Sequence, residues 1–441
     1  MSPLRKLASF STVLLVCLVS AAPGRAQEPI RQIIIGGTQQ RLAVPPCVPR
    51  GTDDMSRDAC ATITRVLRDD LAFQALFKFV DEGLYSALRK LEPDAPDFED
   101  WQSIYANFLI AVRADADPNG LALDLRVYSV DTAELILSQR HTGQVEDVRT
   151  LAHRAADAFM ALTQYAGVAR SRIVFSSDRD DLDGDGSTKE LYMSDYDGYN
   201  VRRVTVNRSL NILPSWKPNG DGLAYVSYRS GAPDVYVASL LAGQSLNLTQ
   251  GAGQSFAPAW SPDGSQVAFG STRSGNMEIW SANADGSGMR NLTQNRATDT
   301  APTWSPNGRE IAFTSDRGGT PQIWVMGADG LNVRRLTSVG NHSDGAAWSP
   351  SRQHSEIAYT SRLEGGTFEI AVLDLVTRQV RQLTTGGGSC EGPSWSPNGR
   401  HLVFSCNRLR RWQLAMCDRL GYQLRTIDVG AGQNVYPDWS R

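Results

Sequence analysis

One short stretch of the sequence has the residue types and spacing of a cation site. Asp181, Asp183 and Asp185 occupy alternate positions, with glycines at 184 and 186. Carboxylates at this spacing can converge on one hard cation such as calcium, because glycine allows the sharp turn. The twelfth position is Tyr192 where a helix-loop-helix calcium site has glutamate, and the loop joins two predicted strands. The stretch is therefore either a weak calcium candidate or a solvated acidic turn, and we expect no other cofactor.

The sequence lacks the common patterns of catalysis. It has no G-x-S-x-G nucleophile elbow, no phosphate-binding P-loop and no dinucleotide fingerprint. The histidines are scattered and no C-x-x-C pair occurs, so zinc-ligand spacing is missing as well. His342, Asp344 and Glu391 are the one group from which a hydrolytic channel site could be built, and their types are too generic to indicate one. We predict that the protein is not an enzyme.

The charge balance argues against polyanionic partners. The 441 residues carry 44 basic and 47 acidic side chains, which gives a formal charge of −3. Such a chain offers no basic face to nucleic acid or to an anionic bilayer. Arg408, Arg410 and Arg411 form a local basic cluster, which is either a contact for an acidic partner or a solvated loop.

The first 26 residues have the three parts of a secretory signal. Arg5 and Lys6 precede the apolar run 7–19, and small residues follow up to Ala26, after which we expect cleavage. The apolar run is shorter than the roughly 20 residues that span a bilayer. We therefore predict an exported protein without direct membrane insertion, and we expect a monomer.

Five cysteines follow the predicted signal, in a compartment that permits disulfides. Cys47 and Cys60 lie close in sequence and are candidates for a local bridge. Cys390, Cys406 and Cys417 lie near the other end of the sequence. The odd total leaves at least one thiol unpaired, and the pairing stays open.

A seven-residue motif recurs through the second part of the chain. Pro258-Ala-Trp-Ser-Pro-Asp-Gly264 is nearly repeated at 214–220, 302–308 and 393–399, with weaker copies at 346–351 and 437–440. The steps between the tryptophans are 44, 44, 44, 47 and 44 residues. Three further strand-like runs, separated by turn sequences, lie between successive copies. Four short strands per repeat are typical of one propeller blade.

The repeated tryptophans are predicted to be structural. A buried tryptophan removes roughly 150–250 Å² from water, so six of them would hold blade against blade. A sugar-binding role is the alternative, but their fixed place beside a turn favours packing. The six are Trp216, Trp260, Trp304, Trp348, Trp395 and Trp439.

The ends of the repeat region predict a closed ring of six blades. The first strand-like run, Arg172 to Ser177, matches the second strand of a blade and has no tryptophan strand before it. Such a strand occurs at the other end, from Val435 to Ser440. If it joins the first blade, the ring closes and the sheet edges are hidden.

The region before the repeats has a mixed pattern. Apolar residues at helical spacing predict a helix from Asp54 to Val80, with Ser56 or Asp58 near its start, and a second helix from Val145 to Tyr165. Alternation predicts strands at 108–112, 121–127 and 135–138, the first two forming a hairpin. We therefore predict a signal peptide over 1–26, an α/β domain over 27–168 and an all-β six-bladed propeller over 169–441.

Blade topology indicates which face of the propeller binds a partner. The loops after the second and fourth strands of each blade emerge on one face, around the mouth of the central channel. These loops diverge in sequence, whereas the Asn/Asp-Gly turns of the opposite face are interchangeable, so the divergent set is the better candidate for binding. The candidate residues are Asn207, Gln254, Ser255, Arg296, Thr298, Asp299, Thr300, His342, Asp344, Glu391 and Asn434.

The chain resembles the TolB family of periplasmic propeller proteins of the Tol-Pal system. The resemblance rests on the export signal, the small α/β domain and the P-x-W-S-P-[DN]-G repeats. It is strengthened by Glu190-Leu-Tyr-Met-Ser-Asp-Tyr-Asp-Gly-Tyr-Asn200, which is similar to the first-blade signature of the family. Ile33, Ile34 and Ile35 lie where the family has its N-terminal partner segment. The chain departs from the common pattern in the three cysteines of its sixth blade, in Arg408 to Arg411 and in the acidic first-blade loop.

The resemblance implies a non-enzymatic interaction module in the periplasm. The propeller mouth would bind the lipoprotein Pal, and the N-terminal segment would communicate with TolA, in support of outer-membrane integrity and cell division. The alternatives that the sequence leaves open are a periplasmic glycan-binding propeller and a propeller hydrolase with a channel site.

Overall fold

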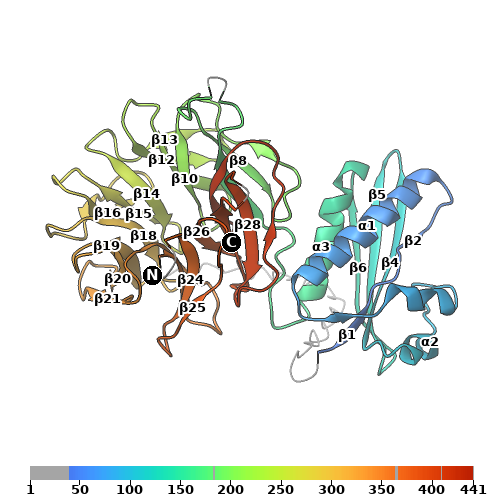
Figure 1. Cartoon of the computed structure of the whole chain (residues 1–441). Helices are drawn as coiled ribbons and strands as arrows, with labels where there is room; N and C mark the ends of the chain where they lie inside the picture. The colour runs from blue at the N-terminus through green and yellow to red at the C-terminus, as the bar shows by residue number, and fades with distance from the viewer. Residues whose placement is uncertain (1–38, 182–183, 363–365, 409, 441) are drawn as a thin grey trace, which may run out of the picture.

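The computed structural model describes residues 39–181, 184–362, 366–408 and 410–440, so the predicted signal peptide lies outside the described residues. A mixed sheet with helices is followed along the chain by six four-stranded sheets arranged in a ring (Figure 1). The predicted α/β domain and six-bladed propeller are thereby confirmed, while the boundaries at 26 and 168 stay predictions. No helix of the described ranges is long and apolar enough to cross a bilayer.

The N-terminal sheet has the strand order β3-β1-β4-β5-β6, and β2 also pairs with β4. β1 runs parallel to β3 and β4, whereas β4, β5 and β6 form an antiparallel meander. Asp117 accepts hydrogen bonds from the amides of Asn119 and Gly120, which fixes the predicted hairpin turn. The strands are β1 (Arg41–Ala43), β2 (Val48–Pro49), β3 (Lys78–Phe79), β4 (Phe108–Asp117), β5 (Gly120–Ser129) and β6 (Glu134–Gly143).

Helices cover both faces of this sheet. The helices α1 (Asp54–Phe73) and α3 (Val148–Met160) pack on each other and on β4, β5 and β6. On the other face, Trp101 of α2 (Phe98–Ser103) and Tyr85 of the 3₁₀ helix η1 (Glu82–Ala87) pack in one cluster with Leu109 and Tyr128. A second 3₁₀ helix, η2 (Val145–Asp147), leads into α3.

The first helix is shorter than its apolar pattern predicts. It begins at Asp54 because the side chain of Asp53 caps it, accepting a hydrogen bond from the Ser56 amide at 2.8 Å. It ends at Phe73, and Ala75 has a positive φ of 51°. The predicted end at Val80 is therefore wrong: residues 78 and 79 pair with β1 as strand β3. The second predicted helix, to Tyr165, likewise ends early, at Met160.

Each propeller blade has one antiparallel sheet with the tryptophan strand first in its order. These first strands face the channel, and the other three follow outward. The blades are, in order, β30-β7-β8-β9, β10 to β13, β14 to β17, β18 to β21, β22 to β25 and β26 to β29. The first strands are β30 (Asn434–Trp439), β10 (Asn211–Trp216), β14 (Ser255–Trp260), β18 (Asp299–Trp304), β22 (Ser343–Trp348) and β26 (Cys390–Trp395).

In each blade the second and third strands have six residues, and the fourth, at the rim, has two or three. The second strands are β7 (Arg172–Ser177), β11 (Gly222–Ser227), β15 (Gln266–Ser271), β19 (Glu310–Ser315), β23 (Glu356–Ser361) and β27 (His401–Cys406). The third strands are β8 (Glu190–Asp195), β12 (Asp234–Ser239), β16 (Glu278–Asn283), β20 (Gln322–Gly327), β24 (Glu369–Asp374) and β28 (Gln413–Asp418). The fourth strands are β9 (Arg202–Arg203), β13 (Ser245–Asn247), β17 (Arg290–Asn291), β21 (Arg334–Arg335), β25 (Val380–Gln382) and β29 (Arg425–Thr426).

The ring closes as the sequence predicts. β30 pairs antiparallel with β7, with Trp439 opposite Ile173 and Asn434 opposite Ser177. The amide of Arg172 also donates to the Ser440 hydroxyl at 2.8 Å. The first blade is therefore built from two segments that lie far apart in the sequence.

The repeated tryptophans hold neighbouring blades together. Trp216 packs with Val174 and Leu191 of the preceding blade, and its indole N–H donates to the Asp438 carbonyl oxygen at 3.1 Å. Equivalent bonds run from Trp304 and Trp395 to the main chain of the blade before each. All six line a cavity of about 100 Å³ at one end of the channel. Five are buried, whereas Trp348, which precedes the divergent turn of the fifth blade, is partly exposed.

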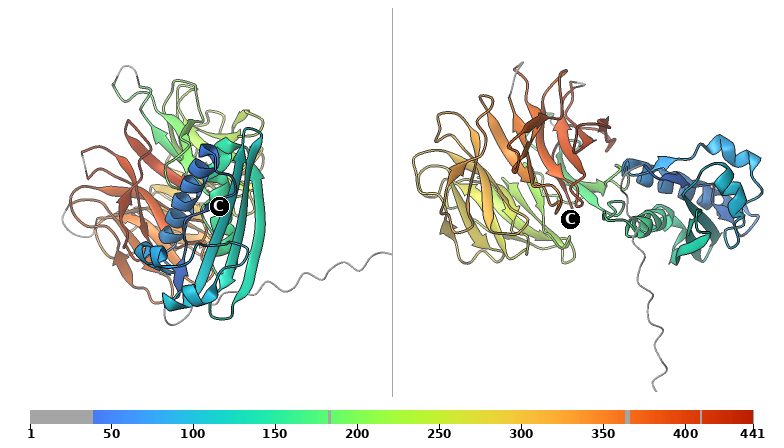
Figure 2. Two further views of the ribbon diagram at one scale, coloured as in Figure 1. Left: turned by 90° about the vertical axis from the view of Figure 1, so that its right-hand side faces the viewer. Right: turned by 90° about the horizontal axis from the view of Figure 1, so that it is seen from below.

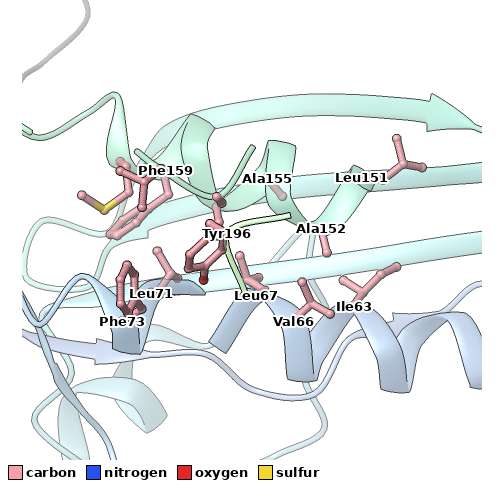
Figure 3. Packing of buried hydrophobic residues seen from close by; sticks show 14 of the residues in the cluster. Ile63, Val66, Leu67, Leu71, Phe73, Leu151, Ala152, Ala155, Phe159 and Tyr196 are labelled. Carbon is pink, nitrogen blue, oxygen red and sulfur yellow. The ribbon is translucent and has the colours of Figure 1, made fainter. Parts of the chain in front are cut away.

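One continuous apolar core joins the two domains, which lie side by side (Figure 2). Tyr196 of the first blade reaches between α1 and α3, close to Leu67 and Ala155 (Figure 3). In the sixth blade, the His401 ring stacks on Phe73 with 3.9 Å between ring centroids, and its Nε2 lies 2.9 Å from the Phe73 carbonyl oxygen. The domains are thus joined by burial and by specific hydrogen bonds.

Two disulfides occur in the described part of the chain. Cys47 is bonded to Cys60, which confirms the local bridge, and Cys390 is bonded to Cys406. The latter joins β26 to β27 in the sixth blade. Cys417 is free and buried, and burial, with a smaller effect of Asp418, raises the pKa of its thiol to about 12.

Candidate partner-binding mouth of the propeller

The two faces of the propeller differ in how they are occupied. The N-terminal domain contacts the face of the Asn/Asp-Gly turns: Asn398 donates to the Ala166 carbonyl oxygen at 2.9 Å, and Arg400 donates to that of Gln74 at 3.1 Å. The first strands begin at the opposite face, where the fourth strand of one blade connects to the next blade. We call these six connections the mouth loops; they are residues 204–210, 248–254, 292–298, 336–342, 383–389 and 427–433.

Buried side chains hold four of the mouth loops in place. In each, a threonine at the start of the loop donates to a carboxylate or amide oxygen at the start of the third strand. The same threonine oxygen accepts a backbone amide of that strand. The pairs are Thr249 with Asp234 (2.8 Å), Thr293 with Glu278 (2.6 Å), Thr337 with Gln322 (2.8 Å) and Thr384 with Glu369 (2.6 Å).

The same buried acids also fix the loop backbone. The amides of Gly251, Asn295 and Gly386 donate to the side chains of Asp234, Glu278 and Glu369 at 2.9–3.0 Å. Burial alone raises the pKa of Asp234, but the hydrogen bonds from Asn247, Thr249 and Ser230 outweigh it and the pKa is lowered. Our reading of the sequence missed these pairs. The signal was present, because each of these blades has a Leu-Thr pair and an acid or glutamine at matching places.

The predicted contact residues fall into three groups by exposure. Gln254, Arg296 and Thr298 are exposed in their mouth loops. Asn207, Thr300, His342, Asp344 and Glu391 are partly exposed. Ser255, Asp299 and Asn434 are buried, with exposed fractions of 0%, 0% and 1%. The structure therefore corrects the expectation of direct contact for these last three.

The three buried residues support the loops from below. Asp299 accepts hydrogen bonds from Arg317 and from Asn295, both at 2.7 Å. The Ser255 hydroxyl donates to the Ser271 hydroxyl at 3.0 Å. Asn434 accepts a hydrogen bond from Arg179 at 3.0 Å. Their sequence position next to a loop did not reveal that the side chains point into the blade.

The fifth and sixth blades place two carboxyl groups at the channel. Asp344 accepts a hydrogen bond from the Thr314 hydroxyl of the fourth blade at 2.7 Å. Burial raises the pKa of Glu391, and the charge of Asp344 raises it further. The rings of His342 and Phe368 pack at an interplanar angle of 71°, with 5.1 Å between centroids. Gly345 and Gly392, which follow the two carboxyl residues, line a channel cavity of about 200 Å³.

The structure does not gather His342, Asp344 and Glu391 into a metal-binding group. Over the described ranges, His153, Asp195 and Asp197 are the one set of three such side chains whose ligand atoms lie within 4.8 Å of one another. That set lies at the junction of the two domains and not at the mouth.

Other sequence-predicted features are only partly described. Asp181 accepts a hydrogen bond from the Gly186 amide, and Asp185 accepts one from the Ser187 amide, so both stabilise the turn. Asp183 lies outside the described residues, as do Ile33, Ile34 and Ile35, and the calcium hypothesis stays a prediction. Arg408 donates to the Thr385 carbonyl oxygen at 3.0 Å, which ties the basic cluster to a mouth loop.

Comparison with known proteins agrees with this architecture. The family described as TolB beta propeller domain matches residues 159–441, and the TolB amino-terminal domain matches residues 33–136. Curated relatives named Tol-Pal system protein TolB include that of Desulfosudis oleivorans, 34% identical over 183 residues (40% of each chain). That of Roseobacter denitrificans is 32% identical over 248 residues, 55% of this chain and 56% of the relative. The matches thus span about half the length of these relatives.

A solved structure, TolB from Acinetobacter baumannii, has the same fold over nearly the whole chain. The superposition has a TM-score of 0.78 at 24% identity and covers 92% of this chain and 97% of the other. The propeller profile alone matches more than half of the 441 residues. Together with the closed ring and its repeated tryptophans, this match shows that the chain belongs to the TolB family.

Proposed function

We propose that this chain is a periplasmic, non-enzymatic component of the Tol-Pal system whose propeller mouth binds Pal. The observation that carries the proposal is the match to the TolB propeller family over residues 159–441. Four of the six mouth loops add physical support, since buried hydrogen bonds already hold them in place. A surface that is ordered before binding loses less conformational entropy when a partner docks. Supporting outer-membrane integrity and cell division is the cellular role that goes with this assignment.

The proposal gives the N-terminal segment a second task, communication with TolA. Ile33, Ile34 and Ile35 are the residues assigned to it, on the resemblance stated above. Because the segment precedes the first described strand, the assignment is tested by deletion of residues 27–35. We expect that deletion to abolish binding of the soluble part of TolA and to leave Pal binding unchanged.

Calorimetric titration with the soluble domain of Pal from the same organism tests the mouth. We expect saturable binding that Gln254→Ala and Arg296→Ala each weaken by about tenfold, which corresponds to about 1.4 kcal/mol. Arg309→Ala is the matched control. Arg296 precedes β18 at the mouth, whereas Arg309 follows β18 in the turn at the opposite face and is also exposed. It should bind as the unmodified protein does.

Two results would contradict the proposal. If the unmodified protein gives no binding heat with Pal, the assignment to the Tol-Pal system loses its main content, and the glycan-binding and hydrolase alternatives come next. If Arg309→Ala weakens binding and the mouth variants do not, Pal binds at the opposite face.

A further inference from the structure

The turn between β8 and β9 brings two carboxylates to the junction with the N-terminal domain. Gly198 lies in this turn with a φ of 92°, and its amide donates to the Asp195 carbonyl oxygen at 3.0 Å. A Cβ at this position would lie 2.5 Å from the carbonyl oxygen of Asp428, so glycine is required for the close approach. The backbone that carries Asp195 and Asp197 is therefore held in place against the sixth blade.

An imidazole from the N-terminal domain faces these carboxylates. His153 of α3 is 3% exposed, and its Nδ1 lies 2.7 Å from an Asp70 oxygen. Asp70 also accepts a hydrogen bond from the Tyr196 hydroxyl at 2.7 Å. A carboxylate that holds Nδ1–H fixes the tautomer and leaves the Nε2 lone pair free to bind a metal.

The other nitrogen of this ring has no hydrogen-bond partner in the described structure. His153 Nε2 is buried and lies 4.0 Å from Asp197 Oδ2, which is too long for a hydrogen bond. Two electron-pair donors thus face each other across a gap. Zinc bonds of about 2.0–2.1 Å to nitrogen and about 2.0–2.2 Å to oxygen would bridge that gap.

We propose that His153, Asp195 and Asp197 bind a divalent transition-metal ion, for which Zn²⁺ is the best match, at the junction of the two domains. This site goes beyond the proposed partner binding. The three ligand atoms lie within 4.8 Å of one another, so small side-chain rotations bring them onto one ion. One imidazole and two carboxylates suit zinc, with water as the fourth ligand.

The surroundings set the expected affinity and the route of entry. Arg149 pairs with Asp197 and lies over the Tyr199 ring, 3.6 Å from its centroid. The ion would share this carboxylate with a guanidinium, so we expect a micromolar site and not a tight structural one. A cavity of about 440 Å³, lined by Arg149, Asp197 and Tyr199, gives the ion access from solvent.

Calorimetric titration of the mature, untagged protein with ZnCl₂ tests the site. We expect one equivalent bound, with Asp195→Asn and Asp197→Asn each weakening binding at least tenfold. Asp285→Asn is the matched control, because Asp285 occupies in the β16–β17 turn the place that Asp197 has in the β8–β9 turn. The Gly286 amide donates there to the Asn283 carbonyl oxygen, as the Gly198 amide does to that of Asp195. Co²⁺ in place of Zn²⁺ should give the visible absorption of a four-coordinate site, which Asp195→Asn abolishes.

The ligands come from both domains, so binding also has a structural readout. We expect Zn²⁺ to raise the melting temperature of the unmodified protein and not that of Asp195→Asn. Absence of binding heat, or equal binding by the unmodified protein and both aspartate variants, would overturn the proposal. The space between His153 Nε2 and Asp197 would then be explained by a proton on His153 instead of a metal ion. Asp195 is partly exposed, so its variant folds without burying an unpaired group and keeps the test decisive.

Discussion

The hydroxyl of Tyr196 in the first blade donates a 2.7 Å hydrogen bond to the Asp70 carboxylate in the N-terminal domain, and both residues are 2% exposed. The bond ties the two domains at a point that water does not reach. Burial of a carboxylate is costly unless its oxygens have donors, so each donor at this place matters for how firmly the domains are joined.

Tyr196→Phe should therefore destabilise the protein although it keeps the ring. The buried Asp70 oxygen would lose its donor, at a cost of about 1–3 kcal/mol in the free energy of unfolding. Denaturant unfolding followed by circular dichroism measures the change. Tyr105→Phe is the control, since Tyr105 is 74% exposed and its variant should stay within about 0.5 kcal/mol of the parent. Equal stability of the two variants would show that Asp70 gains nothing from this bond.

Asp299→Ala should unfold the protein more easily instead of only weakening partner binding. The substitution leaves the Arg317 guanidinium, which is 20% exposed, without its carboxylate at 2.7 Å. Removal of one partner of a buried pair costs about 3–5 kcal/mol. Thermal unfolding measures it, with the exposed Arg296→Ala as the control. An unchanged melting temperature would contradict the stabilising role of the Asp299–Arg317 pair.

The protein should lose stability on mild acidification through His401. Burial first, and the charge of Arg400 second, lower the pKa of His401 to about 3 in the folded protein. The unfolded chain takes up this proton near pH 6.5, so the neutral imidazole contributes its full stability above that pH and loses it as the pH falls toward 3. Between pH 7 and pH 5, the loss is about 2 kcal/mol.

Comparison with His401→Phe isolates this contribution. The phenyl ring keeps the stack on Phe73 and does not titrate. The stability difference between the unmodified protein and the variant should therefore shrink by about 2 kcal/mol from pH 7 to pH 5, as measured by urea unfolding at both values. A difference that does not change with pH would contradict the buried, neutral state of His401.

The Cys390–Cys406 bridge should be replaceable by serines at a moderate cost. In the third blade, Ser255 and Ser271 occupy the same paired positions and form a 3.0 Å hydrogen bond. The double variant Cys390→Ser, Cys406→Ser should gain such a bond and lose the constraint on a 16-residue separation, for a net loss of about 2–3 kcal/mol. Thermal unfolding measures the loss. A collapse of the fold would instead show that the serine pair of the third blade is no substitute.

The propeller was predictable from sequence because each blade repeats its turn chemistry. A Pro-Asn/Asp-Gly turn follows the tryptophan in four of the six copies. The run that begins at 172 has no tryptophan strand before it, and an unassigned one begins at 435. The direction in which a side chain points could be predicted less well from the sequence. Asp299 stands next to a divergent loop in sequence, yet it begins β18 and points into the blade.

Contacts between residues that are far apart in the sequence could not be predicted from local sequence patterns. Asp70 and His153 are 83 residues apart, and Asp70 and Tyr196 are 126 apart, so no spacing rule links them. The early end of α1 was missed for a related reason. Leu76 and Phe77 continue the apolar series of the helix, but they are buried in the extended segment that leads to β3.

The closure of the ring by β30 also sets the order in which the molecule can form. Arg172 and Ser440 are 268 residues apart, and bringing such distant segments together costs roughly 5 kcal/mol of chain entropy. During synthesis, five complete blades and the outer strands of the first emerge before the strand that closes them. Until that strand arrives, β7 has an open edge that can pair with another chain. The nascent protein is therefore most exposed to aggregation just before residues 434–439 of β30 are delivered.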